Sequence, residues 1–388
     1  MADEVAVRAS APSNTLTASP GWRADDSGVM DSVRKDLAIP ARRAAVPSSS
    51  PRGRLAAMDP LDALTEIAYL LERERSSRYK SKAFRTAADV VAGLSPEELR
   101  DAARLRRRQG IGDSTFRVIQ EALAGEVPAY LADLRERTGG AGRSALRGLL
   151  RGDLHSHSDW SDGLTPIGLM VAAARRLGHE YLALTDHSPR LTVANGLSAE
   201  RLERQLEVVA TLSDEGFTLL SGIEVDILDD GALDQDDALL ARLDVVVASV
   251  HSRLRMDAAS MTRRMLGAIR NPRTRVLGHC TGRLVEGARG TRPPSAFDAH
   301  AVFAACAEHD VAVEINARPE RQDPPDDLIA LALEQGCLFS IDSDAHAPGQ
   351  LSLLDYGAER AERAGVPPER IVTTWPLERL RAWLERTA

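Results

Sequence analysis

Two histidines one residue apart begin the part of the chain that is richest in possible metal ligands. His155 and His157 lie in the segment 152–163, which reads G-D-L-H-S-H-S-D-W-S-D-G and follows a short apolar run. Residues i and i+2 of an extended strand point to the same side, so both imidazoles are expected to face one point. Asp162 follows in a turn that ends on glycine. Imidazole and carboxylate groups bind zinc, manganese and iron, although an isolated H-x-H is more often two polar residues at a strand end.

The same pattern recurs downstream, where further apolar runs each end at or carry a possible metal ligand. The runs are Y-L-A-L-T-D-H with His187, F-T-L-L-S-G-I-E-V-D-I with Glu224, L-D-V-V-V-A-S-V-H with His251, T-R-V-L-G-H with His279, V-A-V-E-I-N with Glu314 and Asn316, and L-F-S-I-D-S-D-A-H with Asp344 and His346. Successive runs are 27 to 37 residues apart, and one strand–helix unit takes roughly 30 residues. The stretches between them have helical signals, such as the Thr165-Pro166 start and the Gly178 stop. Seven such units predict a closed α/β barrel with its site at the carboxyl ends of the strands.

These motifs, in this order, resemble those of the PHP family (polymerase and histidinol phosphatase). The motifs that carry the resemblance are D-L-H-S-H-S-D-W-S-D-G, L-T-D-H-S, G-I-E-V-D-I, A-S-V-H-S, L-G-H-C-T-G-R, V-E-I-N-A and D-S-D-A-H. The most similar pattern is that of the PHP domain at the C-terminus of bacterial family-X DNA polymerases, and it covers about residues 148–388. The resemblance implies a distorted seven-stranded β/α barrel that occupies residues 149–388 and holds up to three divalent ions of manganese, zinc or iron.

The resemblance also implies a set of nine metal ligands. These are His155, His157, Glu224 and Asp344 for one ion, Glu224, His251 and His279 for a second, and Asp162, His187 and His346 for a third. Glu224 would bridge two ions and thereby take part in catalysis, since two ions about 3.5–4 Å apart can clamp a phosphate. The remaining histidines have no motif around them and are expected to be surface or packing residues: His179, His300 and His309.

Other polar residues near the motifs receive supporting roles. Arg283 is expected to stabilise charge on the phosphoryl oxygens as a catalytic residue. For Glu314 and Asn316, a role beside the ligands or substrate and ordinary structural hydrogen bonding are equally open. Asp186 and Asp226 flank ligands and are expected to orient them rather than bind metal.

Residues 58–128 have the pattern of a small all-helical domain. Apolar residues recur with helical spacing from Leu61 to Leu71, and a second helix is expected over Ser81–Ala92. Two further helices flank a G-I-G turn, which resembles the helix-hairpin-helix DNA-binding motif, although an ordinary turn between helices is the alternative. Glycines let backbone amides approach a phosphate at a helix N-terminus, and arginines add charge. The expected DNA contacts are Gly110, Ile111, Gly112, Arg106, Arg107, Arg108 and Arg117.

This segment, with R-Y-K-S-K-A-F-R-T-A-A, resembles the N-terminal helical domain of family-X polymerases, but two features differ. Only residues 129–148 separate it from the barrel, and this stretch is expected to be a linker because a domain needs at least about 50 residues. The nucleotidyltransferase domain of those polymerases is therefore missing from this position, and polymerisation is expected to be absent. Some relatives form a Schiff base through a lysine after the turn, where this chain has Val118. Lys80 and Lys82 are further possible phosphate contacts.

Composition and charge set the remaining expectations. Residues 1–57 are rich in Ala, Ser, Pro and Arg and are expected to form a disordered tail. Residues 1–150 carry 24 Lys and Arg against 20 Asp and Glu, whereas the remainder carries 25 against 37, as expected of a domain that binds several cations. Without a long apolar run or an apolar signal core, the protein is expected to be cytoplasmic or associated with the nucleoid, with no membrane contact. Three cysteines without paired spacing fit a reducing compartment. No obligate protein partner is inferred.

Two enzymatic functions are compatible with these motifs. The leading one is a metal-dependent phosphoesterase that acts on DNA as a 3′-5′ exonuclease or 3′-end-processing nuclease in DNA repair, because it uses both the barrel and the helices. The alternative is a small-molecule phosphatase or phosphodiesterase of the histidinol-phosphate or nucleotide type, which needs only the barrel. A DNA-binding scaffold without activity is disfavoured because the ligand set is complete. The leading function also assigns DNA binding to the helical segment and hydrolysis to the barrel alone.

Overall fold

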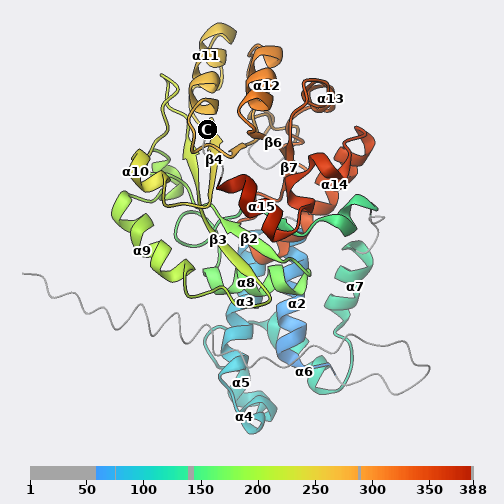
Figure 1. The fold of residues 1–388 in the computed structure, drawn as a ribbon. Helices are drawn as coiled ribbons and strands as arrows, with labels where there is room; N and C mark the ends of the chain where they lie inside the picture. The colour runs from blue at the N-terminus through green and yellow to red at the C-terminus, as the bar shows by residue number, and fades with distance from the viewer. Residues whose placement is uncertain (1–57, 75, 139–143, 287–289, 386–388) are drawn as a thin grey trace, which may run out of the picture. The chain divides into compact units, whose positions relative to one another are not determined.

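The protein has a group of helices followed by a parallel β/α barrel (Figure 1). The structure is a computed structural model and describes residues 58–74, 76–138, 144–286 and 290–385. The disordered tail expected over residues 1–57 lies outside this range. None of the described helices is both long enough and apolar enough to cross a membrane.

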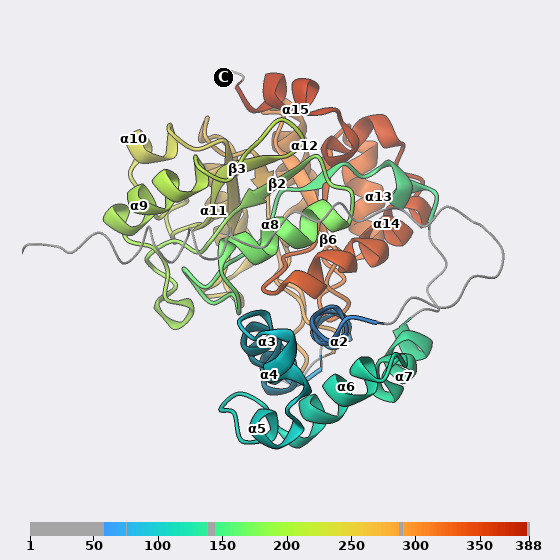
Figure 2. The same ribbon diagram turned by 90° about the horizontal axis from the view of Figure 1, so that it is seen from below.

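Six helices make up the first group, which Figure 2 shows gathered around α2. They are α2 (Pro60–Arg73), α3 (Arg78–Ala92), α4 (Pro96–Arg100), α5 (Ala102–Arg106), α6 (Asp113–Leu123) and α7 (Ala129–Thr138). Asp59 caps α2 by accepting a hydrogen bond from the amide of Leu61 at 2.8 Å, and Pro60 occupies the first turn. The apolar faces of α2, α3 and α6 form one buried cluster that includes Leu64, Ile67 and Ile119.

The predicted hairpin is present, and the segment after it differs from the prediction. Helices α5 and α6 flank the G-I-G turn, in which Gly110 has a φ of +89° that a residue with a side chain rarely adopts. Helix α7 fills the first part of the stretch expected to be a linker. Leu131 and Leu134 of α7 are fully buried in the helical cluster, so these residues belong to the helical group.

Seven parallel strands form the sheet in sequence order, which confirms the predicted fold class. They are β1 (Gly152–Asp153), β2 (Tyr181–Leu184), β3 (Thr218–Asp226), β4 (Val245–Ser249), β5 (Val276–Leu277), β6 (Ala312–Asn316) and β7 (Phe339–Asp342). The connections contain α8 (Ile167–Arg176), η2 (Thr192–Ala194), α9 (Ala199–Val209), α10 (Asp237–Leu240), α11 (Ala258–Ile269), α12 (Ala299–Glu308) and α13 (Asp326–Glu334), and η1 (Leu146–Leu149) precedes β1. After β7 come η3 (Pro348–Leu353), α14 (Leu354–Arg363), η4 (Pro368–Arg370), η5 (Val372–Thr374) and α15 (Leu377–Leu384).

The seam between β1 and β7 is closed by few backbone contacts and several carboxylate contacts. A parallel bridge joins Ser156 to Ala345, just beyond the two strands. Below it, the amide of Leu154 donates to Asp342 Oδ1 at 2.9 Å, and Asp153 accepts from the amide of Ser343 at 3.2 Å. Residues 155–157 and 344–346, at opposite ends of the barrel sequence, therefore lie side by side.

Alternate side chains of each strand point either into the barrel interior or toward the surrounding helices. In β4, Val245 and Val247 belong to the cluster that also contains Trp375 and Trp383, whereas Val246 and Ala248 belong to the cluster with the surrounding helices. In β3, Ile223 and Val225 belong to this second cluster. Because neighbouring residues of a strand point to opposite faces, Glu224 between them points into the barrel.

Arg264 on α11 is the largest fully buried side chain, and it braces two loops that carry site residues. Its guanidinium donates to the carbonyl oxygens of Ile227 and Leu228 after β3 and of Ser252 after β4, at 2.9 to 3.0 Å. Replacing Arg264 with methionine would remove a donor from each of these carbonyls, of which that of Leu228 would keep the amide of Gly231 as a partner. We expect a decrease of about 2–4 kcal/mol in the free energy of unfolding, measured by chemical denaturation. The matched substitution of the exposed neighbour Arg263 should change it by less than about 0.5 kcal/mol, and equal losses in both variants would contradict the assignment.

Candidate functional site

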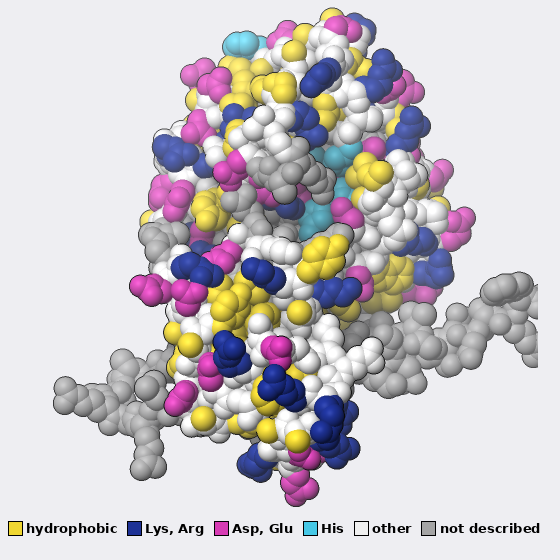
Figure 3. Space-filling view, turned by 180° about the vertical axis from the view of Figure 1, so that it is seen from behind, with side chains coloured by type: hydrophobic (Ala, Val, Ile, Leu, Met, Phe, Trp, Pro, Cys, Tyr) yellow, Lys and Arg dark blue, Asp and Glu magenta, His cyan; other side chains and the backbone are white. Residues whose placement is uncertain are grey.

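All nine predicted ligand residues lie at the carboxyl ends of the strands, on one side of the barrel. Histidine side chains are visible at the base of a hollow in the surface (Figure 3). In chain order, three residues follow β1 (His155, His157 and Asp162), one follows β2 (His187), one lies two residues before the end of β3 (Glu224), one follows β4 (His251), one follows β5 (His279) and two follow β7 (Asp344 and His346). The sequence therefore identified the set that the fold brings together.

The carboxylate of Glu224 is the centre of this cluster and is only 1% exposed. Its Oε1 lies 2.8 Å from His279 Nε2 and 3.2 Å from His251 Nε2. Its Oε2 lies 2.8 Å from His187 Nδ1 and 3.3 Å from His155 Nε2. A carboxylate that faces imidazoles with both oxygens has the geometry expected of a residue that bridges two cations.

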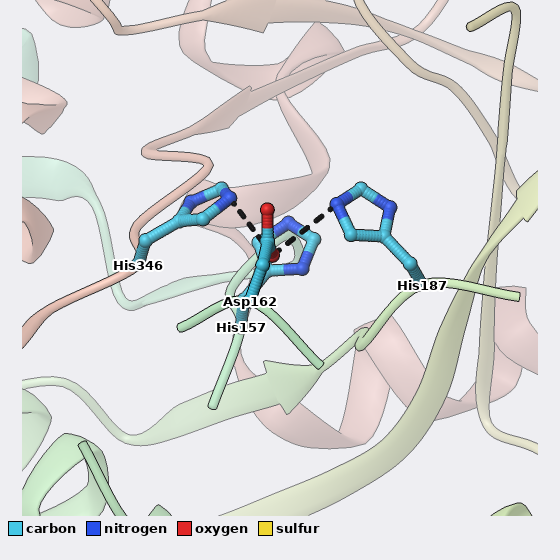
Figure 4. Close-up of side chains that lie close together, drawn as sticks. All are labelled: His157, Asp162, His187 and His346. Atoms are coloured by element: carbon cyan, nitrogen blue, oxygen red, sulfur yellow. Dashed lines mark ion pairs between the residues drawn. The ribbon is translucent and has the colours of Figure 1, made fainter. Parts of the chain in front are cut away.

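A second carboxylate, Asp162, lies between two imidazoles on the side of the cluster shown in Figure 4. Its Oδ1 is 3.3 Å from His346 Nε2 and 3.5 Å from His187 Nε2. The ring of His157 stacks obliquely beside that of His346, with ring centroids 4.2 Å apart. His157 Nε2 in turn lies 3.4 Å from Asp344 Oδ1.

Three groups of these residues are compact enough to hold one ion each, because their ligand atoms lie within 4.8 Å of one another. The groups are His155, His157 and Asp344; His187, Glu224 and His251; and His157, Asp162, His187 and His346. The predicted sets are closely related but not identical. His187 joins Glu224 and His251 as well as the third group, and His279 contacts Glu224 without belonging to any of the three groups.

The donor atoms of the cluster fit a cation better than they fit one another. Buried and without a hydrogen-bond partner among the described residues are His155 Nε2, both ring nitrogens of His157 and Asp162 Oδ1. Buried polar atoms without partners are costly, so such a concentration points to a ligand that satisfies them. Burial lowers the pKa of His157 to about 3, with the charges of His346 and His187 acting in the same direction. His157 is therefore a neutral imidazole at neutral pH, which is the form that binds metal.

The charges of the central residues shift one another's pKa values. Burial alone would raise the pKa of Glu224, but the surrounding imidazoles, His251 and His155 foremost, hold it well below its ordinary value. Burial would likewise lower the pKa of His251, yet the carboxylates of Glu224 and Asp226 raise it to about 9. The anionic carboxylates thus draw protons onto the imidazoles, and a divalent cation would replace those protons.

Three acidic residues support the cluster from outside it, and two of them contact imidazoles. Glu314 Oε1 lies 2.6 Å from His155 Nδ1, and Asp226 Oδ1 lies 2.5 Å from His251 Nδ1, so each fixes the ring nitrogen that faces away from Glu224. Asp186 accepts a hydrogen bond from the backbone amide of Ser158 at 2.9 Å and thereby shapes the loop that leads to Asp162.

The side-chain amide of Asn316 also lies beside the ligands. Its Nδ2 donates to Glu314 Oε2 and to Asp344 Oδ2, both at 3.2 Å. These contacts give Glu314 and Asn316 positions beside the ligands.

Two arginines in the loop after β6 contact the cluster, and sequence reasoning did not single them out. Arg318 Nη1 donates to the carbonyl of Asp344 at 3.0 Å and lies 3.1 Å from His346 Nδ1, while Arg321 Nε donates to Asp344 Oδ2 at 3.1 Å. Their sequence signal is their place directly after the E-I-N strand end, in A-R-P-E-R. Arg283 instead donates to the carbonyls of Arg321 and Gln322, so its guanidinium supports the loop that carries the other two arginines.

Two residues of the cluster have backbone conformations that residues with side chains rarely adopt. Asp344 has a φ of +50° and His279 a φ of +20°. Such conformations cost free energy and persist where the surrounding structure enforces them, commonly at functional sites. Here they accompany the approach of Asp344, after β7, to His157 and of His279, after β5, to Glu224.

The hairpin of the helical group exposes some of the predicted DNA contacts to solvent, whereas others form ion pairs or hydrogen bonds within the protein or are buried. Arg107 and Arg117 are exposed, whereas Arg106 pairs with Asp113 at 2.8 Å and Arg108 with Glu98 at 2.9 Å. The amide of Gly112 is bound by Thr115 Oγ1 at 2.9 Å, and Ile111 is buried. Val118 is buried in the helical core, where it has no access to a substrate, and Lys80 and Lys82 on α3 are exposed.

Comparison with known proteins agrees with both parts of the chain. The family described as the PHP domain matches residues 153–318, and the family described as a helix-hairpin-helix domain matches residues 57–127. A solved histidinol phosphate phosphatase from Lactococcus lactis, in complex with zinc, L-histidinol and phosphate, aligns with 55% of this chain and 94% of its own. The alignment has a TM-score of 0.41 and a sequence identity of 18%.

Two curated relatives differ in how much of their length the chain covers. The DNA polymerase/3′-5′ exonuclease PolX of Bacillus subtilis is 36% identical over 241 residues, which are 62% of this chain but 42% of that protein. The chain thus spans less than half of the polymerase. A probable phosphatase of Vibrio parahaemolyticus is 31% identical over 233 residues, which are 57% of this chain and 88% of that protein. With the barrel, its ligand cluster and these matches in agreement, the chain belongs to the PHP family of metal-dependent phosphoesterases.

Proposed function

We propose that this protein is a metal-dependent 3′-5′ exonuclease or 3′-end-processing nuclease that acts on DNA. The observation that carries the proposal is the presence, in one chain, of eight residues in three compact ligand groups, with His279 beside them, and a helix-hairpin-helix segment with exposed arginines. A small phosphoester needs only the cluster, whereas a polyanionic substrate also benefits from the hairpin. The name of the B. subtilis relative, which includes a 3′-5′ exonuclease, supports the choice of DNA end.

The residues that would hold the ions are the three compact groups built around Glu224, Asp162 and Asp344. Divalent ions at such sites lower the pKa of water and stabilise charge on phosphoryl oxygens. Manganese, zinc and iron all accept this mixture of imidazole and carboxylate donors. The contacts of Glu224 with His187 and His251 of its own group and with His155 of a second group support the bridging role that the family resemblance implies for it.

The chain's own groups would orient the site and bind the phosphate. Glu314 and Asp226 fix the tautomers of His155 and His251, so that each presents its other nitrogen to the site. Arg321 contacts Asp344 through Nε, so its two terminal nitrogens would donate to phosphoryl oxygens. Arg318 also pairs with Glu320, at 2.9 Å through Nε and 2.8 Å through Nη2, and would mainly hold Asp344 and His346 in place. Arg283 would act through them, because it holds the backbone of the loop on which they lie.

A small-molecule phosphatase is the second candidate. It is favoured by the V. parahaemolyticus relative, because the match covers most of that probable phosphatase. The 233 matched residues are also close in number to the residues of the barrel alone.

A direct comparison of two substrates separates the candidates. The purified, manganese-loaded protein should shorten a 5′-labelled primer one nucleotide at a time from its 3′ end while leaving histidinol phosphate almost unchanged. Rapid release of phosphate from histidinol phosphate, with the primer intact, would favour the phosphatase.

Metal content is the most basic consequence of the proposal. The reconstituted protein should contain two to three divalent ions per chain, measured by elemental analysis after gel filtration. His155→Ala or Glu224→Ala should lose bound metal and hydrolytic activity together, because each removes a donor from the centre of the cluster, while the circular dichroism spectrum is kept. Manganese, zinc and iron all absent from the reconstituted wild type at stoichiometric levels would refute the proposal.

The hairpin should contribute salt-dependent DNA affinity. Replacing Arg107 and Arg117 with alanine should reduce the slope of log K against log salt by about 2, since each phosphate contact contributes about 0.9. Binding would be measured by fluorescence anisotropy of a labelled primer–template at several salt concentrations. Arg135→Ala is the control, because this arginine lies on α7 and pairs with Glu66 at 2.6 Å. An unchanged slope in the double variant would exclude the hairpin as the DNA anchor.

A further inference from the structure

Helix α2 packs against η3, the short helical segment that follows the last ligand residue of the barrel. The contact is built around Glu72 of α2, which is only 3% exposed. Its carboxylate accepts from the amide of Gly349 at 2.9 Å and from Arg85 of α3 through two nitrogens, at 2.6 and 2.5 Å. A buried carboxylate needs such partners, so Glu72 joins α2, α3 and η3 at one point.

The two backbones meet without room for a side chain. A β-carbon added to Gly349 would lie 2.1 Å from the carbonyl oxygen of Tyr69 and 2.7 Å from the β-carbon of Glu72. Because the nearest atom belongs to backbone and not to a flexible side chain, even an alanine at this position would force the helix and η3 apart. The glycine is therefore required by this contact.

The clamped segment also holds His346. Gln350, the residue after Gly349, accepts a hydrogen bond from the backbone amide of His346 through Oε1 at 2.8 Å. The carbonyl of His346 accepts from the amide of Leu164 at 2.7 Å, and its Nε2 faces Asp162 at 3.3 Å. The position of the His346 backbone thus depends on a side chain that η3 presents.

Ion pairs extend the contact beyond this one carboxylate. Asp355, near the start of α14, lies 2.8 Å from Arg73 of α2 and 3.0 Å from Arg147 of η1. All three side chains are about a fifth exposed or less. The segment from Gly349 to Asp355 is therefore fixed against α2 at both of its ends.

We propose that Glu72 is a positioning residue for His346, so that the helical segment supports a metal group to which it contributes no ligand. The inference rests on the proposed metal site. It adds a second role to the segment, which the sequence assigned to DNA binding only. Displacing η3 from α2 would move Gln350, release the His346 backbone and weaken the group formed by His157, Asp162, His187 and His346 while leaving the Glu224-centred group intact.

The test uses full-length variants and a substrate that does not need the hairpin. Gly349→Ala and Glu72→Ala separate α2 from η3, and Gly148→Ala is the matched control, since a β-carbon there meets no atom within 4 Å. Manganese binding would be followed by electron paramagnetic resonance, and hydrolysis by steady-state kinetics on bis(4-nitrophenyl) phosphate. We expect one class of manganese sites to weaken by about 10- to 100-fold, the usual effect of losing a partner that orients a ligand. We also expect kcat to fall about tenfold or more, with KM within about threefold, because His346 would be misplaced.

A conservative variant distinguishes positioning from general stability. Glu72→Gln keeps an oxygen that can accept from the amide of Gly349, so it should recover most of the manganese affinity that Glu72→Ala loses. Wild-type affinity and kcat in both Gly349→Ala and Glu72→Ala would overturn the inference, as would an equal weakening of all manganese sites, which indicates general loss of fold. Failure of the wild type itself to bind manganese, zinc or iron would instead refute the proposed function.

Discussion

The site depends on the burial of one carboxylate, that of Glu224, among several imidazoles whose nitrogens are not all hydrogen-bonded. A buried ion is tolerated only when charges and hydrogen bonds surround it closely, and four histidines approach its two oxygens to within 3.3 Å. Several of the surrounding polar atoms are left without partners. Bound cations would satisfy these atoms, and the rest of the barrel keeps the donors in place.

That framework works by strand alternation and by closure of the seam. Apolar residues on either side of Glu224 face the helices, so the carboxylate points into the barrel. The seam brings His157 and Asp344, from the first and last strand ends, to within 3.4 Å. Residues outside the barrel sequence also contribute, since α2 fixes the segment that follows His346 through Glu72. The helical group is thus connected to the site by structure as well as by its proposed affinity for DNA.

The repeated ends of apolar runs made the barrel and the nine-residue cluster predictable, because each run gives a strand and each strand end delivers a polar residue to one face. The grouping of ligands was less predictable. His187 lies near both Asp162 and Glu224 because its two ring nitrogens face in different directions, which residue type alone does not specify. Arg318 and Arg321 depend on the conformation of a loop, and Arg283 was expected at the phosphate although its guanidinium binds that loop. The packing of α7 and the burial of Glu72 arise from contacts between distant segments, for which one sequence carries no local pattern.

We propose that cations occupy the groups centred on Glu224, Asp162 and Asp344. The decisive measurement is anomalous diffraction from crystals of the manganese- or zinc-loaded protein, recorded on both sides of the metal absorption edge. We expect two or three anomalous peaks within bonding distance of these residues, with Glu224 between two of them. Peaks confined to other parts of the molecule, with the cluster collapsed into direct hydrogen bonds between its own side chains, would contradict this proposal.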